Sequence, residues 1–178
     1  MKGQTHLMGA AAFAVPAAAL AGAPYLIVVG IVAGLSPDLD ASDATLKHWS
    51  VNLGDRKKGL RIKPFYFISE FVTIFFKHRG FLHSAWALII FTVVALVVTM
   101  LAGLADSYFF ALAVLLGYLS HLLLDGMTPA GIPLWGKEKW HTVPEKYRIR
   151  TGSYIENLFI ALFAAVVLYY LSLSVVNL

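Results

Sequence analysis

The chain has 178 residues, of which 59% are apolar and 13% charged, and its formal net charge is +4. Soluble domains carry about a quarter charged residues, so this composition excludes an ordinary soluble enzyme and indicates a membrane protein with one domain, residues 1–178. Cysteine is absent, which excludes disulfides and thiolate metal sites. A small positive charge in a membrane protein reports orientation, so we expect no nucleic-acid partner.

The first apolar stretch, residues 7–35, is too long for one simple span and too short for two full ones. Leu20 to Pro24 read as a break, which predicts a hairpin of two short helices over 7–20 and 24–35. The alternative is one tilted helix kinked at Pro16. A cleaved signal peptide is a third interpretation, which we reject because Pro16 interrupts its apolar region and the segment carries only one positive charge.

Three later stretches predict spanning helices over residues 82–105, 107–125 and 154–176, since each is long enough to cross a bilayer and nearly free of charge. The first two should be antiparallel because only a short link around Asp106 joins them. Ser153 and Glu156 have the capping-box spacing that begins a helix. The expected fold is therefore an all-α, polytopic membrane bundle with an N-terminal short-helix hairpin and three spanning helices.

The remaining segments are polar or too short to span. Residues 41–63 and 126–152 predict loops, and residues 64–76 predict an aromatic-rich interfacial helix. On this topology all fourteen Lys and Arg residues fall on one side. The positive-inside rule makes that side cytoplasmic, so we expect a multi-pass protein of the cell inner membrane.

Histidines and carboxylates gather at the same end of the predicted bundle, at the boundaries of the apolar stretches: His6, Asp38, Asp40, His78, His83, His121, Asp125 and Glu156. Ionisable groups at this depth are costly unless they pair or bind something. His121 and Asp125 are four residues apart, so both project from one helix face. We expect His48 and His141 to lie outside this group.

Imidazole and carboxylate together are the ligands of hydrolytic Zn, Mn or Fe sites. The group without Glu156 suits two divalent transition-metal ions, Zn or Mn, with positions left open for water. Each residue alone also has an ordinary interpretation, such as a helix–helix hydrogen bond. Glu156 is either a helix cap or a general base, and Arg79 either anchors the chain at the interface or clamps a phosphate oxygen.

Four blocks of sequence carry a family likeness: THLMG at 5–9, SPDLD at 36–40, KHRGFLHS at 77–84 and GYLSHLLLDGMTPAGIPLW at 117–135. They resemble the YdjM-like family of bacterial and archaeal membrane-bound, predicted metal-dependent hydrolases, over most of the chain. Leu82 and Gly136 depart from the family pattern, which usually has Thr and Pro there, but neither is a candidate ligand. The resemblance implies metal ligands at His6, Asp38, Asp40, His78, His83, His121 and Asp125.

The first hypothesis for function is a metal-dependent hydrolase of a lipid-linked phosphoester at the cytoplasmic membrane surface, with membrane lipid as its partner. Arg79 and Glu156 would act as catalytic residues beside the bound ions. The alternative is a non-enzymatic protein with a structural or sensing metal site and a basic docking face. An ion or proton pathway ranks last, because the outer halves of the helices offer only Thr, Ser and Tyr as polar groups.

Overall fold

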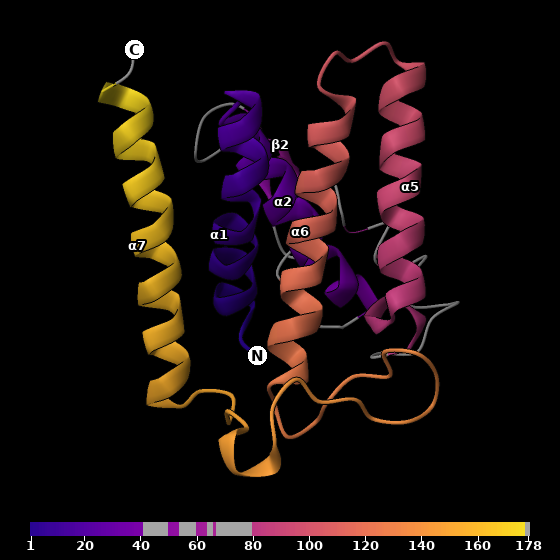
Figure 1. The fold of residues 1–178 in the computed structure, drawn as a ribbon, viewed down its shortest axis with the longest axis vertical. Coiled ribbons are helices and arrows are strands. Elements are labelled where there is room, and N and C mark those ends of the chain that lie inside the picture. The colour runs from indigo at the N-terminus through magenta and orange to yellow at the C-terminus, as the bar shows by residue number, and fades with distance from the viewer. Residues whose placement is uncertain (41–49, 54–59, 64–65, 67–79, 177–178) are drawn as a thin grey trace.

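The computed structural model describes residues 1–40, 50–53, 60–63, 66 and 80–176. Within these residues the fold is a bundle of helices: α1 (Gly3–Ala21), α2 (Tyr25–Leu35), α5 (Ala85–Leu101), α6 (Ser107–Gly126) and α7 (Tyr154–Val176) (Figure 1). Helix α6 is central and packs against α1, α2 and α5, whereas α7 packs on α1. The prediction of a helical bundle is confirmed.

The N-terminal stretch forms a hairpin. Gly22 ends α1 in the left-handed conformation, with φ of 62°, and α2 begins three residues later. The two helices pack together along their length, so the single kinked span is wrong. The first arm is nevertheless longer than predicted: it begins at Gly3, runs through Pro16 and measures about 28 Å at 1.5 Å per residue. It starts early because the Lys2 amide and the Thr5 hydroxyl are both held by the carboxylate of Glu156.

Glycines allow α2 to approach its neighbours closely. A Cβ atom added at Gly117 of α6 would collide with the backbone of Gly30, and one at Gly34 would collide with Ala10 of α1. Gly30 and Gly34 are four residues apart and thus share one face of α2. Small residues at this spacing let helix backbones meet in membranes. This close packing sets the distance between α2 and the lower half of α6.

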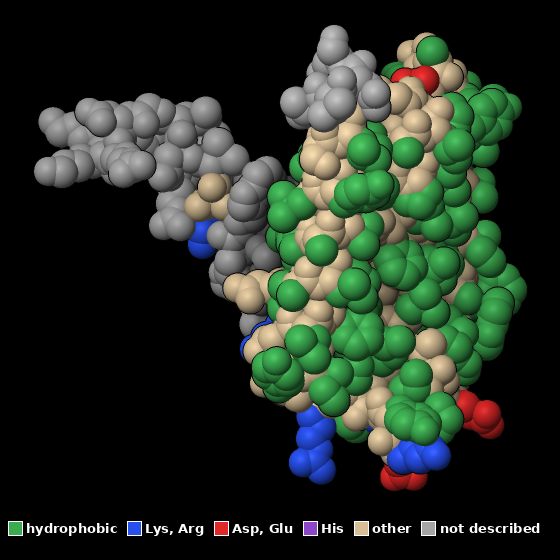
Figure 2. Space-filling model, turned by 60° about the vertical axis from the view of Figure 1, so that its left-hand side comes forward, with side chains coloured by type: hydrophobic (Ala, Val, Ile, Leu, Met, Phe, Trp, Pro, Cys, Tyr) green, Lys and Arg blue, Asp and Glu red, His purple; other side chains and the backbone are tan. Residues whose placement is uncertain are grey.

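Two helices are long and apolar enough to cross a bilayer, Ser107–Gly126 and Tyr154–Ser174. Three spans are not confirmed, because α5 has 17 residues: it begins only after the Ser84 cap and ends just before Gly103, which has φ of 72°. The face shown in Figure 2 is covered largely by hydrophobic side chains, and acidic groups are seen only at its two ends. The interfacial helix predicted over 64–76 lies, apart from Tyr66, outside the described residues.

The predicted loops contain more structure than expected. Residues 41–63 include two short strands that pair antiparallel, β1 (Val51–Leu53) and β2 (Leu60–Ile62), so the description as a loop alone is wrong. The 126–152 loop contains the 3₁₀ turn η3 (Glu145–Tyr147) and packs under the bundle, where Ile132 is fully buried. Thr142 caps α6 there, since its amide and hydroxyl donate to the carbonyls of Gly126 and Leu123.

Candidate metal centre

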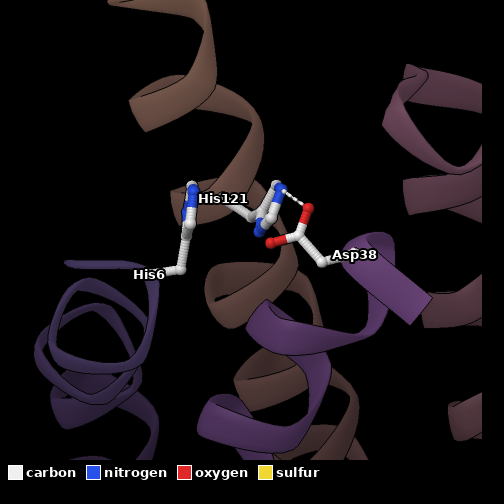
Figure 3. A group of neighbouring side chains, drawn as sticks. All are labelled: His6, Asp38 and His121. Atoms are coloured by element: carbon white, nitrogen blue, oxygen red, sulfur yellow. Dashed lines mark ion pairs between the residues drawn. The ribbon is translucent and has the colours of Figure 1, made fainter. Parts of the chain in front are cut away.

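Four chain segments bring imidazoles and carboxylates together at the end of the bundle covered by the 126–152 loop. His6 comes from the first turns of α1, and Asp38 from the 3₁₀ turn η1 (Ser36–Asp40) that follows α2. His83 ends the 3₁₀ turn η2 (Phe81–His83), and His121 and Asp125 lie on the last turns of α6. Figure 3 shows His6 and Asp38 on opposite sides of His121.

The innermost donor atoms lie within contact distance of one another. Nε2 of His121 is 3.3 Å from Nε2 of His83, and Oδ1 of Asp38 lies 3.6 and 3.5 Å from these two atoms. Oδ2 of Asp125 lies 3.9 Å from the His83 nitrogen and 4.0 Å from the His121 nitrogen. Each of the two nitrogens therefore lies within 4.0 Å of an oxygen from both carboxylates.

These separations can be compared with a coordination sphere. Zinc binds imidazole nitrogen and carboxylate oxygen at about 2.0–2.2 Å, so a tetrahedral ion sets its donor atoms about 3.3–3.6 Å apart. The five separations given above, 3.3 to 4.0 Å, lie at or slightly above that range. Imidazole with carboxylate is also a suitable donor set for Zn or Mn. The residues present therefore fit a divalent transition-metal ion.

The ring of His121 is oriented by the backbone. Its Nδ1 lies 2.8 Å from the carbonyl oxygen of Gly34, so Nδ1 carries the proton and donates. Nε2 then carries the lone pair and points into the group. Ligand histidines are commonly held in this way, with the second ring nitrogen donating to a carbonyl.

His6 extends the group on the α1 side. Its ring stacks on His121, with 3.8 Å between centroids, and its Nε2 lies 3.2 Å from Oδ1 of Asp125. The Met1 amine lies 2.5 Å from the same oxygen. Asp125 thus turns one oxygen toward His6 and the other toward His83 and His121. Among the described residues, no hydrogen-bond partner meets Nδ1 of His6, which is buried.

Burial differs across the group. The side chains of His83 and His121 are fully buried and Asp125 is 2% exposed, whereas Asp38 is 23% exposed. Asp38 therefore forms the side of the group nearest to solvent.

Five of the seven predicted ligands belong to this group. They form two overlapping triads, one of His6, Asp38 and His121 and one of His83, His121 and Asp125. The backbone of Asp40 ends η1, but its side chain lies outside the described part, as do His78, Arg79 and His48. His141 lies elsewhere, with its Nε2 3.4 Å from the Pro129 carbonyl oxygen.

Glu156 is fully buried and connects the start of α7 to the start of α1. Its carboxylate accepts hydrogen bonds from the Lys2 amide at 2.6 Å, the Thr5 hydroxyl at 2.7 Å and the Gly152 amide at 2.5 Å. The predicted cap at Ser153 is also present, since Ser153 Oγ accepts from the Glu156 amide. The catalytic role stays a prediction, while these contacts hold the turn of α1 that carries His6.

Three supporting groups were not found from the sequence. Tyr118 donates from its hydroxyl to the Leu82 carbonyl at 2.5 Å and so holds η2, while the Gly34 carbonyl orients His121. Arg148 has a buried Nε that meets no partner among the described residues, and the next amide donates to Met127 beside the end of α6. The spacing of Gly30 and Gly34 is a sequence pattern that could have predicted the close approach of α2. Nothing in the sequence distinguishes Arg148 from the other basic residues of its loop.

Comparisons with known proteins identify the family of the chain. The model of the YdjM inner membrane protein family matches residues 1–177. The chain is similar to Inner membrane protein YdjM of Escherichia coli (strain K12), with 34% identity over 131 residues, 68% of this chain and 57% of that relative. The same values hold for Inner membrane protein YdjM of Shigella flexneri. The matched part thus spans little more than half the length of these relatives, and no solved structure matches.

Proposed function

Because the chain belongs to the YdjM inner membrane protein family, we propose that it is a metal-dependent hydrolase of a lipid-linked phosphoester, working at the cytoplasmic membrane face. One observation carries the proposal: Nε2 of His83 and Nε2 of His121 are 3.3 Å apart, and each lies within 4.0 Å of one oxygen of Asp38 and one oxygen of Asp125. Groups of this kind are held together in an apolar bundle at a high cost in desolvation, which a bound cation offsets.

The described ligands support one ion more directly than two. The two triads share His121, and the Nδ1 of that ring is already engaged by Gly34. A second ion would use His6 and the other oxygen of Asp125, completed by Asp40 or His78. A divalent ion bound at this position supplies a nucleophile from water at neutral pH and neutralises charge on a phosphoryl group.

Basic side chains complete the proposed site. Arg79 is the proposed donor to the phosphate, and Arg148 is a second candidate because its Nε is buried close to the end of α6. Lys137, Lys139, Lys146 and Arg150 belong to the same 126–152 loop that covers the metal-binding end. This charge supports the cytoplasmic orientation by the positive-inside rule and would attract an anionic head group.

The experiment measures phosphate release from a panel of phosphoesters in nanodiscs, with Zn or Mn added back to metal-free protein. We expect turnover only with metal, preferring lipid-tailed substrates. His121→Ala should lower it more than about 100-fold, since even residues that only orient metal ligands contribute 10- to 100-fold. His141→Ala is the matched control. Equal activity with and without metal would overturn the hydrolase proposal.

A second candidate function is a closed structural or sensing metal site. The burial of His83, His121 and Asp125 favours it, because structural sites have saturated shells. The exposed edge of Asp38 favours an open site instead. X-ray absorption of the loaded protein distinguishes them: a coordinated water supports hydrolysis, whereas a shell of protein ligands alone, together with no turnover, supports the structural role.

A further inference from the structure

An apolar groove of about 480 Å³ runs between α2 and α5. Both helices pack against α6 but not closely against each other, so the groove has α2 and α5 as walls and α6 as its base (Figure 1). Its lining is aliphatic and aromatic apart from Ser36, and includes Val28 on α2, Val94 and Val98 on α5, and Val114 on α6. The wall residues Val28, Val94 and Val98 are more than half exposed, whereas Val114 in the base is buried.

The α2 wall of the groove ends two residues before Asp38 of the candidate metal centre. Along α2 the lining runs from Val28 to Ser36, about 12 Å at 1.5 Å per residue, and Asp38 follows two residues later. Ser36 donates its hydroxyl to the Ala33 carbonyl at 2.7 Å, so even the single polar side chain of the lining is satisfied within the helix. The groove therefore offers a ligand no unused hydrogen-bond donor from the side chains of its lining.

The surroundings decide what occupies such a groove. It lies beside α6, one of the two helices able to cross the bilayer, and α5 presents a row of exposed apolar side chains toward the same space. A soluble metabolite would need polar partners, which this lining lacks. A hydrocarbon chain needs none, and the bilayer supplies such chains at the open side of the groove.

We propose that the groove binds the hydrocarbon tail of the lipid whose phosphorylated head group reaches the His and Asp group. The head-group half of this statement rests on the proposed function; binding of the tail in the groove does not. A tail lying in the groove would run along α2 from Val28 to Ser36, which would place the head group near Asp38. Binding of one lipid by both parts explains why the apolar groove and the polar centre use the same segment, Val28 to Asp38.

The test uses the full chain in phosphatidylcholine nanodiscs with a trace of phosphatidylglycerol that carries a photoactivatable diazirine in its tail. We expect peptides from residues 28–36 and 91–98 to label, and Val94→Trp to reduce this labelling several-fold by filling the groove. Val97→Trp is the matched control, because Val97 is on the same helix, is 48% exposed and does not line the groove. Val98→Trp gives a second filled groove if Val94→Trp is poorly folded, as judged by thermal unfolding.

Labelling is measured on metal-free protein, so it does not depend on hydrolysis. If Val94→Trp and Val98→Trp abolish the groove labelling but the protein shows no turnover, lipid binding in the groove is supported and only the hydrolase proposal is overturned. Labelling spread evenly over α7 and the groove, and unchanged in both tryptophan variants, would overturn the groove as a lipid site. So would a groove that stays unlabelled while α7 labels, since another occupant would then fill it.

Discussion

The Nδ1 atom of His121 donates to the carbonyl oxygen of Gly34 over 2.8 Å, so the backbone of α2 orients a candidate ligand on α6. The contact is short because the two helices meet at glycines, Gly117 of α6 lying against Gly30. Through this contact, the geometry of the centre depends on how the N-terminal hairpin packs against α6.

Removing a ligand should release metal from the purified protein. We expect His83→Ala, His121→Ala and Asp125→Ala each to lose bound metal by elemental analysis, because all three lie within the innermost group. His141→Ala should keep it, since that imidazole faces the Pro129 carbonyl. The same metal content in all four variants, each checked for its thermal unfolding, would exclude this centre.

Separating α2 from α6 should weaken both the fold and the site. In Gly117→Val the new side chain meets the Gly30 backbone, which cannot rotate away as a side chain can. Overpacking of this kind costs about 1–3 kcal/mol, so the melting temperature in detergent and the metal content should both fall. Gly136→Val is the control, because its added side chain points into open space. A Gly117→Val protein as stable as Gly136→Val would contradict the close contact.

Glu156 should separate a structural role from a catalytic one. Glu156→Ala leaves the Thr5 hydroxyl and the Lys2 and Gly152 amides without their acceptor, and an unsatisfied buried group costs about 1–3 kcal/mol. Unfolding should therefore occur at lower temperature than in Glu138→Ala, a change in the exposed part of the loop. Glu156→Gln retains one acceptor oxygen for the Lys2 amide and the Thr5 hydroxyl but turns an NH2 group toward the Gly152 amide, so it should recover only part of the stability. If Gln restores the fold but not phosphoester turnover, Glu156 acts as the general base.

The absence of native cysteine makes the orientation testable by single-cysteine labelling. We expect Lys57→Cys and Lys139→Cys to be shielded from an impermeant thiol reagent in intact cells, and Asp106→Cys to react. Positions near 22 and 178 should behave like 106, because all the basic residues belong to the other side. Reaction of Lys57→Cys or Lys139→Cys from outside would reverse the proposed orientation.

Chain order and local chemistry determined the outline of the protein. Apolar runs without charge set α6 and α7 to within one residue of their predicted ends, because a backbone in lipid has few alternatives to a helix. A turn signal at Gly22 predicted the hairpin, since its left-handed conformation is one that glycine adopts readily. Histidines and carboxylates at successive helix ends were thereby predicted to meet at one end of the bundle.

Tertiary contacts decided what local patterns do not contain. The early start of α1 depends on Glu156, more than 150 residues away in the sequence, and the position of His83 depends on the Tyr118 hydroxyl at Leu82. The 3.6 Å between the Asp38 oxygen and the His121 nitrogen depends on the glycine contacts that hold α2 against α6. Periodicity reports which face of a helix is apolar, whereas the distance between two helices is set by the side chains that meet there. For this reason the candidate ligands could be predicted from the sequence, and their arrangement around one point could not.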